Sequence, residues 1–215
     1  MAVYDLEEQE QISEIKAWWD QYGRLVTTIA VAAAVGAVGW QGWKWHQNKQ
    51  AAEAGAIYFA LQQAAENGDA ARTREAAGQL IERFSGTIYA DFAALTSSSV
   101  QFSSGDARNA RAHLEWLVQK GADPVMRDLA RLRLASILLD EGAYAEALNQ
   151  LQAAPVDSLR ARFEDLRGDV LLAEGKHEQA RGAYDAALRA LVAQGVQPGD
   201  TLYEVIQVKS DAVEG

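Results

Sequence analysis

The chain has 215 residues, a formal net charge of −10 and no cysteine. That length is enough for one domain with a substantial core in addition to a membrane anchor. The lack of cysteine excludes disulfides and thiolate metal ligands, and an acidic chain without a basic stripe is a poor candidate for binding nucleic acid. Proline occurs only 3 times, and good helix formers such as Ala, Leu, Glu and Arg dominate, so the composition predicts an all-α fold.

Residues 1–22 are predicted to form an acidic amphipathic tail. Its apolar residues recur at spacings of three, four and seven, which places them on one face of a helix; they are Leu6, Ile12, Ile15, Trp18, Trp19 and Tyr22. The acidic residues Glu7, Glu8, Glu10 and Glu14 fill the other face, and Asp5 is the predicted N-cap. Two interpretations remain open: a helix lying on the membrane surface, or a docking helix for a cytoplasmic or membrane partner. Repulsion between the acidic face and anionic lipid weakens the first.

Residues 23–45 are predicted to cross a membrane. The 19 residues from Leu25 to Trp43 carry no charged side chain. At about 1.5 Å per residue, such a helix matches a hydrocarbon core about 30 Å thick. Trp and Tyr residues stand at both ends, where the headgroup boundary favours them. The positions assigned to this span are Leu25, Gly36, Gly39, Trp40 and Trp43, and the glycines would let another helix approach closely.

Two other interpretations of this stretch remain open. A buried core helix can be equally apolar, but its ends do not usually carry so many tryptophans. A cleaved signal peptide has an apolar segment of similar length, but it begins with basic residues and ends in small ones, whereas this chain begins with acidic residues and continues into WQGWKW. The orientation is not settled by charge, because Lys16 and Arg24 precede the span and Lys44 and Lys49 follow it.

Residues 46–215 are predicted to form a repeat domain. The stretches that begin at Leu129 and Arg160 align with a constant offset of 33 residues, as in 168 − 135 = 33. The matched pairs are Ala135 with Gly168, Leu138 with Leu171, Gly142 with Gly175, Ala147 with Ala180, Leu151 with Tyr184, and Ala154 with Ala187. A period of about 34 residues with a helix–turn–helix pattern predicts a tetratricopeptide-like α-solenoid. Two weaker copies precede these, which makes about four hairpins at residues 49–84, 88–120, 125–154 and 157–192.

Each matched position has a predicted packing role. Small residues let the two helices of a hairpin approach closely, glycines end the first helix in a left-handed conformation, and large apolar residues fill the seam. The predicted packing residues are Ala135, Leu138, Gly142, Ala147, Gly168, Leu171, Gly175, Ala180 and Tyr184. Because Ala135 matches Gly168, a Gly168→Ala change is predicted to be mild. Asp123 followed by Pro124 predicts the start of a helix.

A partner groove is predicted on the first helices of the last two repeats. Repeats that clamp a peptide carboxylate use Lys and Asn, whereas the matching positions here hold Leu132, Ser136, Asp165 and Asp169, which would repel a carboxylate. The predicted groove residues are Leu129, Leu132, Leu139, Arg162, Asp165 and Asp169, which would make mixed apolar and acidic contacts with an extended or helical segment. The alternative is that the three leucines belong to the core between repeats.

No catalytic, cofactor-binding or metal-binding set is predicted. His46, His113 and His177 are isolated from one another in the sequence, and no cysteine is present to complete a metal site. Ser97–Ser99 lack the glycines of a nucleophile elbow. The sequence therefore predicts a protein that is not an enzyme.

The combination of tail, single span and degenerate repeats resembles the YfgM family over the whole length of the chain. The stretch from Phe163 is the most specific, and the residues that carry the likeness are Asp165, Leu166, Arg167, Gly168, Gly175, Ala180 and Arg181. A short helix near Tyr203–Val208 is similar in placement.

This resemblance implies a single-pass protein of the inner membrane in a Gram-negative cell, with a cytoplasmic N-terminus and a periplasmic repeat domain. It implies an ancillary role at the SecYEG translocon, beside a PpiD-type membrane-anchored chaperone, with contacts to inner-membrane lipid and to unfolded or translocating polypeptide. The repeats would act as a scaffold or chaperone-like module that links the translocon to periplasmic chaperones. The alternative is a membrane-anchored regulator whose cytoplasmic tail binds a signalling partner.

Overall fold

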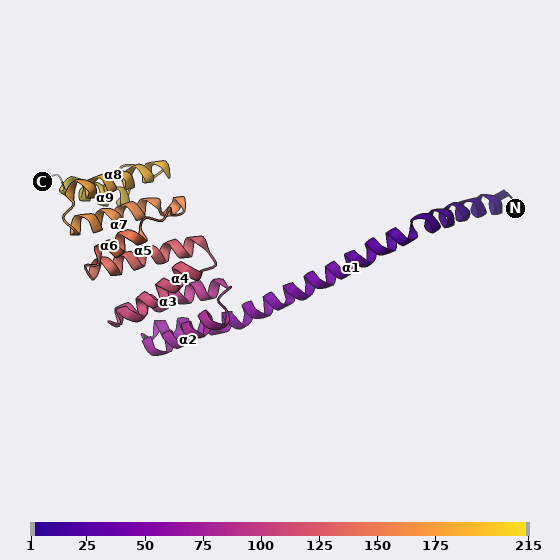
Figure 1. Ribbon diagram of the computed structural model, residues 1–215, viewed down its shortest axis with the longest axis horizontal. Coiled ribbons are helices and arrows are strands. Elements are labelled where there is room, and N and C mark those ends of the chain that lie inside the picture. Colours follow the sequence, from indigo (N-terminus) through magenta and orange to yellow (C-terminus); the bar gives the residue numbers. More distant parts are fainter. Residues whose placement is uncertain (1–2, 214–215) are drawn as a thin grey trace. The chain divides into compact units, whose positions relative to one another are not determined.

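The computed structural model describes residues 3–213, and for residues 3–11, 14 and 15 it describes the backbone alone. Across this range the chain is helical and contains no strand (Figure 1). The helices are α1 (Val3–Glu66), α2 (Ala70–Arg83), α3 (Ile88–Ser103), α4 (Ala107–Lys120), α5 (Pro124–Asp140), α6 (Tyr144–Gln150), η1 (Asp157–Leu159), α7 (Arg160–Ala173), α8 (His177–Ala193) and α9 (Thr201–Ala212). The all-α prediction is confirmed.

The chain divides between Gln50 and Ala51 into two compact units. In the first unit, α1 contains a stretch that is long and apolar enough to cross a membrane, and none of that stretch is buried. Helix α1 begins at Val3, so Asp5 lies inside it, and the predicted N-cap at Asp5 is wrong. On the predicted apolar face of the tail, Ile12, Trp18, Trp19 and Tyr22 are exposed. The side chains of Leu6 and Ile15 and of the acidic residues Glu7, Glu8, Glu10 and Glu14 lie outside the described residues.

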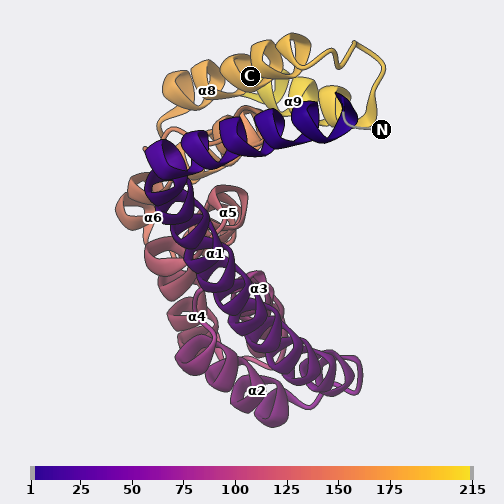
Figure 2. The same cartoon turned by 90° about the vertical axis from the view of Figure 1, so that its right-hand side faces the viewer.

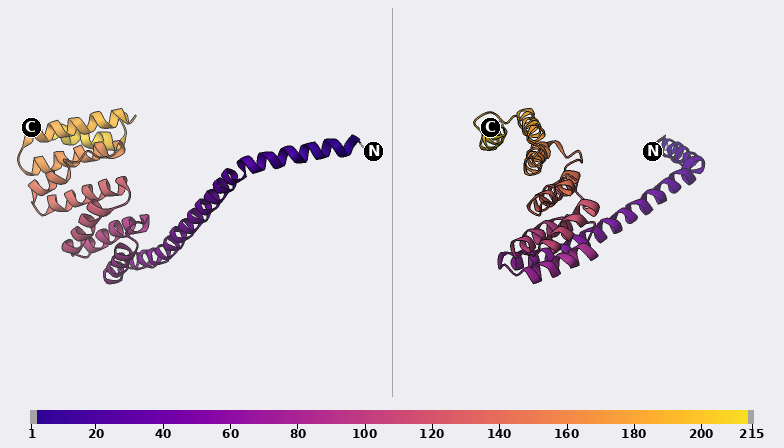
Figure 3. Two further views of the ribbon diagram at one scale, coloured as in Figure 1. Left: turned by 45° about the vertical axis from the view of Figure 1, so that its right-hand side comes forward. Right: turned by 60° about the vertical axis from the view of Figure 1, so that its left-hand side comes forward.

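The second unit is a stack of helical hairpins (Figures 2 and 3). The end of α1 pairs with α2, α3 with α4, α5 with α6, and α7 with α8, and α9 then packs on α8. Figure 2 shows α2, α4 and α6 along one edge of the stack and α3 and α5 along the other. We call the first helix of each pair the inner helix and the second the outer helix.

Each hairpin turns at a glycine in the left-handed conformation. Gly68, Gly105, Gly142 and Gly175 have φ angles of 69°, 85°, 73° and 82°. A side chain in this region would strain the backbone, which is why glycine ends the inner helix in every hairpin. The spacing is 37 residues twice and then 33, from 105 − 68, 142 − 105 and 175 − 142.

Buried carboxylates join successive repeats. Asp91 on α3 is fully buried, and its carboxylate accepts hydrogen bonds from the backbone N–H groups of Ala122 at 3.0 Å and Asp123 at 3.0 Å. Thirty-seven residues later, Asp128 on α5 accepts one from Val156 N–H at 2.9 Å (128 − 91 = 37). Each aspartate therefore accepts hydrogen bonds from backbone N–H groups just before the next inner helix, where these donors have no partner within the helix. Asp123 caps α5 ahead of Pro124, as predicted.

Outer helix α6 is shorter than predicted. It has 7 residues and ends at Gln150, whereas α2 and α4 have 14 each and α8 has 17. The predicted third hairpin to residue 154 is therefore wrong at its end. Pro155 disfavours a helical conformation at the residue before it, and residues 151–156 form a turn followed by a short irregular link in which Leu151 is buried. Helix α7 then begins at Arg160 after the turn η1.

Candidate functional site

The five positions assigned to the membrane span are all exposed in this structure. Leu25 is 62% exposed, and the side chains of Trp40 and Trp43 contact each other with ring centroids 5.6 Å apart. A Cβ atom placed on Gly36 or Gly39 would meet nothing within 4 Å. These positions therefore present an uncovered apolar helix surface, which water disfavours and lipid or another apolar helix accommodates.

The predicted partner groove is largely occupied by the protein itself. Leu129, Leu132 and Leu139 are half-buried and pack against the core that α3 to α7 share, which is the alternative left open by the sequence. Asp165 and Asp169 both hold Lys209 of α9, with Nζ 2.8 Å from Asp165 Oδ1 and 2.8 Å from Asp169 Oδ2. The two carboxylates are thus paired within the chain.

Tyr184 completes this cluster, which we call the Lys209 cluster and define as Asp165, Asp169, Tyr184 and Lys209. The Tyr184 hydroxyl donates to Asp169 Oδ1 at 2.8 Å, and Lys209 Nζ lies 5.8 Å from the centroid of the Tyr184 ring. Burial and the neighbouring Asp169 raise the pKa of Tyr184 well above its ordinary value. Burial raises the pKa of Asp165, and its bond to Lys209 opposes the rise.

Lys209 remains an ammonium in this setting. Burial by itself would lower the pKa of Lys209, but the hydrogen bonds that its ammonium donates to Asp165 and Asp169, together with the charges of these two carboxylates, outweigh burial, so the pKa is raised. The cluster therefore behaves as a partly buried ion pair that fixes α9 against α7. The sequence pattern indicated the acidic pair but not its partner, because Lys209 lies 40 residues from Asp169 along the chain.

A pocket that the sequence analysis missed lies between α3, α4 and α5. Its volume is about 280 Å³, and it is lined by Ser98, Ser99, Phe102, Ser103, Leu114, Arg133, Ser136, Ile137 and Asp140. We call it the serine pocket. Phe102 is 42% exposed, and Arg133 Nη1 donates to the carbonyl of Leu95 at 3.1 Å. Ser97–Ser99 match no nucleophile motif, and the sequence signal for the pocket is that Ser99 and Phe102 are three residues apart, which places them on one face of a helix.

The serine pocket combines hydroxyl groups with one exposed aromatic ring. The hydroxyls of Ser99 and Ser103 can donate to or accept from peptide groups, and Phe102 offers an apolar surface for one side chain. The hydroxyls of Ser98 and Ser136 already donate to backbone carbonyls and can only accept. Arg133 and Asp140 give charges of both signs at the rim.

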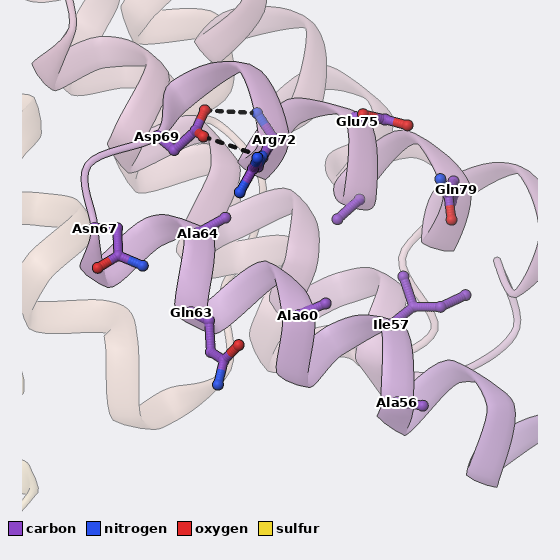
Figure 4. Close-up of a pocket in the computed structure, with 11 residues that line it drawn as sticks. Ala56, Ile57, Ala60, Gln63, Ala64, Asn67, Asp69, Arg72, Glu75 and Gln79 are labelled. Carbon is purple, nitrogen blue, oxygen red and sulfur yellow. Dashed lines mark hydrogen bonds and ion pairs between the residues drawn. The ribbon is translucent and has the colours of Figure 1, made fainter.

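A second hollow lies at the open end of the stack, on the first hairpin. It measures about 520 Å³, and Ala56, Ala60 and Ala64 of α1 line one side of it (Figure 4). Asp69 and Arg72 lie at its α2 side, joined by an ion pair of 3.4 Å. No earlier repeat covers this hairpin, so Ala56 and Ala60 are exposed, whereas Ala64 is buried.

Stacked helical hairpins with hollows on their surfaces, and a long uncovered apolar helix ahead of them, define a membrane-anchored α-solenoid of the kind that binds other proteins. The chain belongs to the tetratricopeptide repeat-like domain family, whose model matches residues 16–215.

Three relatives are named ancillary SecYEG translocon subunit. The protein from Haemophilus influenzae is 28% identical over 184 residues, covering 86% of this chain and 90% of that protein. The protein from Neisseria gonorrhoeae is 25% identical over 211 residues, covering 97% and 98%. The protein from Aggregatibacter actinomycetemcomitans is 29% identical over 186 residues, covering 86% and 90%. These matches confirm the resemblance indicated by the sequence.

Proposed function

We propose that this protein is a non-enzymatic, membrane-anchored scaffold that associates with the SecYEG translocon. The observation that carries the proposal is similarity over nearly the full length to proteins that bear that subunit name, including 97% of the chain in the Neisseria match. An interaction role agrees with a solenoid whose hollows are lined by a mixture of polar, charged and apolar side chains.

The proposed topology assigns residues 1–22 to the cytoplasm, 23–45 to the inner membrane and 46–215 to the periplasm. The uncovered apolar stretch of α1 supports a single crossing. The orientation follows from the family resemblance, since the flanking Lys and Arg residues balance. Inner-membrane lipid is then the first partner, in contact with side chains such as Leu25, Trp40 and Trp43.

The finer part of the proposal concerns polypeptide. We propose that the repeats meet unfolded or translocating chains and a PpiD-type membrane-anchored chaperone, linking the translocon to the periplasmic chaperone network. The serine pocket is the best-supported contact for an extended chain, because Ser99, Ser103 and Ser136 can pair with peptide groups beside Phe102. The predicted groove around Asp165 and Asp169 is less suited, since Lys209 already pairs with both carboxylates.

The test uses the affinity-tagged full-length protein in native membranes. SecYEG should copurify after mild solubilisation, and it should still do so when residues 1–20 are deleted. If SecYEG copurifies with the full-length protein but is lost when residues 1–20 are deleted, the result would instead support a regulator that acts through a cytoplasmic partner. Absence of SecYEG from both purifications would refute the proposed association.

The polypeptide contact has its own test. A photo-crosslinking residue at Ser99 should capture a secretory precursor arrested in the translocon, and the same residue at the exposed Glu178 of α8 serves as the control. Equal capture at both positions would exclude the serine pocket as a specific contact.

A further inference from the structure

A groove on the last hairpin coincides with the shortened outer helix. It consists of two adjoining hollows of about 480 Å³ and 360 Å³ that meet at Ala186. We call it the α7–α8 groove. Its α8 side is lined by Gln179, Gly182, Ala183, Ala186, Arg189, Ala190, Ala193 and Gln194, and its α7 side by Asp157, Arg160, Glu164, Arg167 and Leu171.

The groove opens where a longer α6 would lie. Phe163 and Val170 turn toward the core shared with α5 and α6, while Ala161 belongs to the core shared with α8. By helical periodicity, Glu164 and Arg167 fall between these two directions on α7. No residue of α6 lines the groove.

Comparison with the other hairpins shows how much shorter α6 is than the other outer helices. Outer helices of 14, 14 and 17 residues stand beside one of 7. The shortfall of about 7 residues corresponds to roughly 10 Å of helix. Since α6 runs antiparallel to α5 and stops at Gln150, the missing turns fall beside the start of α7, where Asp157 and Arg160 line the groove.

The side chains on the floor of the groove are small enough for another helix to pack closely against α8. Gly182, Ala186, Ala190 and Ala193 recur at spacings of four and three along α8, so they form one stripe without large side chains. Helices whose contact is made of such residues can pack at the short end of the usual distance of about 8–10 Å.

Of the three arginines at the rim of the groove, one is available to form an ion pair with an acidic residue of a partner. Arg160 pairs with Asp157 at 2.8 Å, and Arg167 pairs with Glu164 at 3.5 Å. Arg189 is exposed and makes no ion pair with any carboxylate in the part of the chain that the structure describes. The net negative charge of the whole chain acts weakly here, because physiological salt screens exposed charges beyond about 8 Å.

We propose that the α7–α8 groove binds an amphipathic helix from a partner protein, one that presents small and apolar residues to the stripe on α8 and a single acidic residue to Arg189. The helix takes the place of the missing turns of α6 and completes the third hairpin. This surface is separate from the serine pocket and does not depend on the translocon association proposed above.

The test measures binding of a designed peptide to the purified full-length chain in detergent by fluorescence anisotropy. The probe is a fluorescein-labelled alanine–leucine peptide of about 14 residues, long enough for four turns, with one Glu flanking its apolar face. Two control peptides carry Lys in place of that Glu, or a central Pro that prevents helix formation. We expect saturable binding of the Glu peptide and at least about tenfold weaker binding of both controls.

Matched variants locate the site. Ala186→Trp fills the groove and should weaken binding by about tenfold or more. Val192→Trp adds the same ring on the same helix at a position that is 56% exposed and outside the groove, and should leave binding unchanged. Arg189→Glu, an exposed change that keeps the fold, should reverse the preference between the Glu and Lys peptides. The proposal is overturned if no peptide binds saturably, if the Pro peptide binds equally well, or if Arg189→Glu leaves the preference unaltered.

Discussion

Gly168 on α7 lies directly against the ring of Tyr184 on α8. A Cβ atom built on Gly168 would stand 2.6 Å from Tyr184 Cδ1 and 2.8 Å from Cζ. Tyr184 is fully buried and its hydroxyl is bonded to Asp169, so the ring has little freedom to move away. The sequence-based expectation of a mild Gly168→Ala change is therefore wrong, although Ala135 stands at the matching position. One repeat earlier, the residue that matches Tyr184 is Leu151, which is not a tyrosine.

We expect Gly168→Ala to destabilise the repeat unit. Overpacking costs about 1–3 kcal/mol, against a gain in helix propensity of about 1 kcal/mol. Urea unfolding followed by circular dichroism measures the net loss. The matched control is Gly78→Ala on α2, where a Cβ atom meets nothing within 4 Å and the same propensity gain should stabilise the protein. Equal responses of the two variants would show that Tyr184 yields to the methyl group.

Replacing Lys209 with Met should loosen α9. The change leaves Asp165 and Asp169 facing each other without a cation, and the Lys209 side chain is only 31% exposed. Loss of hydrogen bonds to charged groups typically costs about 1.5–3 kcal/mol, and partial exposure brings the expected figure to the low end. Limited proteolysis in the link at residues 194–200 should become faster than in the wild type. An Lys209→Arg variant keeps the charge and serves as the control.

The loss in free energy of unfolding caused by Lys209→Met should depend on pH. Burial raises the pKa of Asp165 above its ordinary 3.8, and Lys209 opposes the rise. A carboxyl group with a raised folded pKa costs stability as pH climbs from its unfolded pKa through its folded pKa, because burial disfavours the charged form. Without Lys209 that cost grows, so the stability difference from wild type should shrink on acidification toward pH about 4 and be larger at pH about 7. The contribution of Lys209 itself, whose folded pKa is raised above 10.5, should persist at neutral pH and disappear in strong alkali.

Asp91→Ala should destabilise the junction between the second and third hairpins. The change removes the only side-chain acceptor that Ala122 and Asp123 N–H groups use in the described part of the chain. A buried donor left without a partner costs about 1–3 kcal/mol. Thermal unfolding should show a lower midpoint for Asp91→Ala than for Asp91→Asn, which keeps one acceptor oxygen. Identical midpoints for wild type and Asp91→Ala would mean that water replaces the carboxylate.

Alkaline carbonate extraction should leave the full-length chain in the membrane pellet at its uncleaved mass. The reason is the uncovered apolar stretch of α1, which is too long and apolar to remain in water. The matched fragment of residues 46–215 should be soluble and strongly helical by circular dichroism. Recovery of a soluble product that begins near residues 35–45 would identify a cleaved signal peptide instead.

The sequence by itself determined the helical class, the apolar stretch and the turns of the hairpins. These features are local: helix propensity, an uncharged run and a left-handed glycine act within a few residues of their own position. Gly142 and Gly175 could be recognised at an offset of 33 because each ends its helix for the same backbone reason. The start of α5 at Asp123 and Pro124 was predictable for the same kind of reason.

The tertiary structure alone decided which side chains meet. Lys209 joins Asp165 from 44 residues away, and no periodicity within one repeat predicts a contact made by the helix that follows the last repeat. The ring of Tyr184 over Gly168 depends on the distance between two helices, which the match of Gly168 with Ala135 did not reveal. The same holds for the serine pocket and the α7–α8 groove, since a hollow exists only where neighbouring helices fail to fill the space between them, and that is a property of their packing.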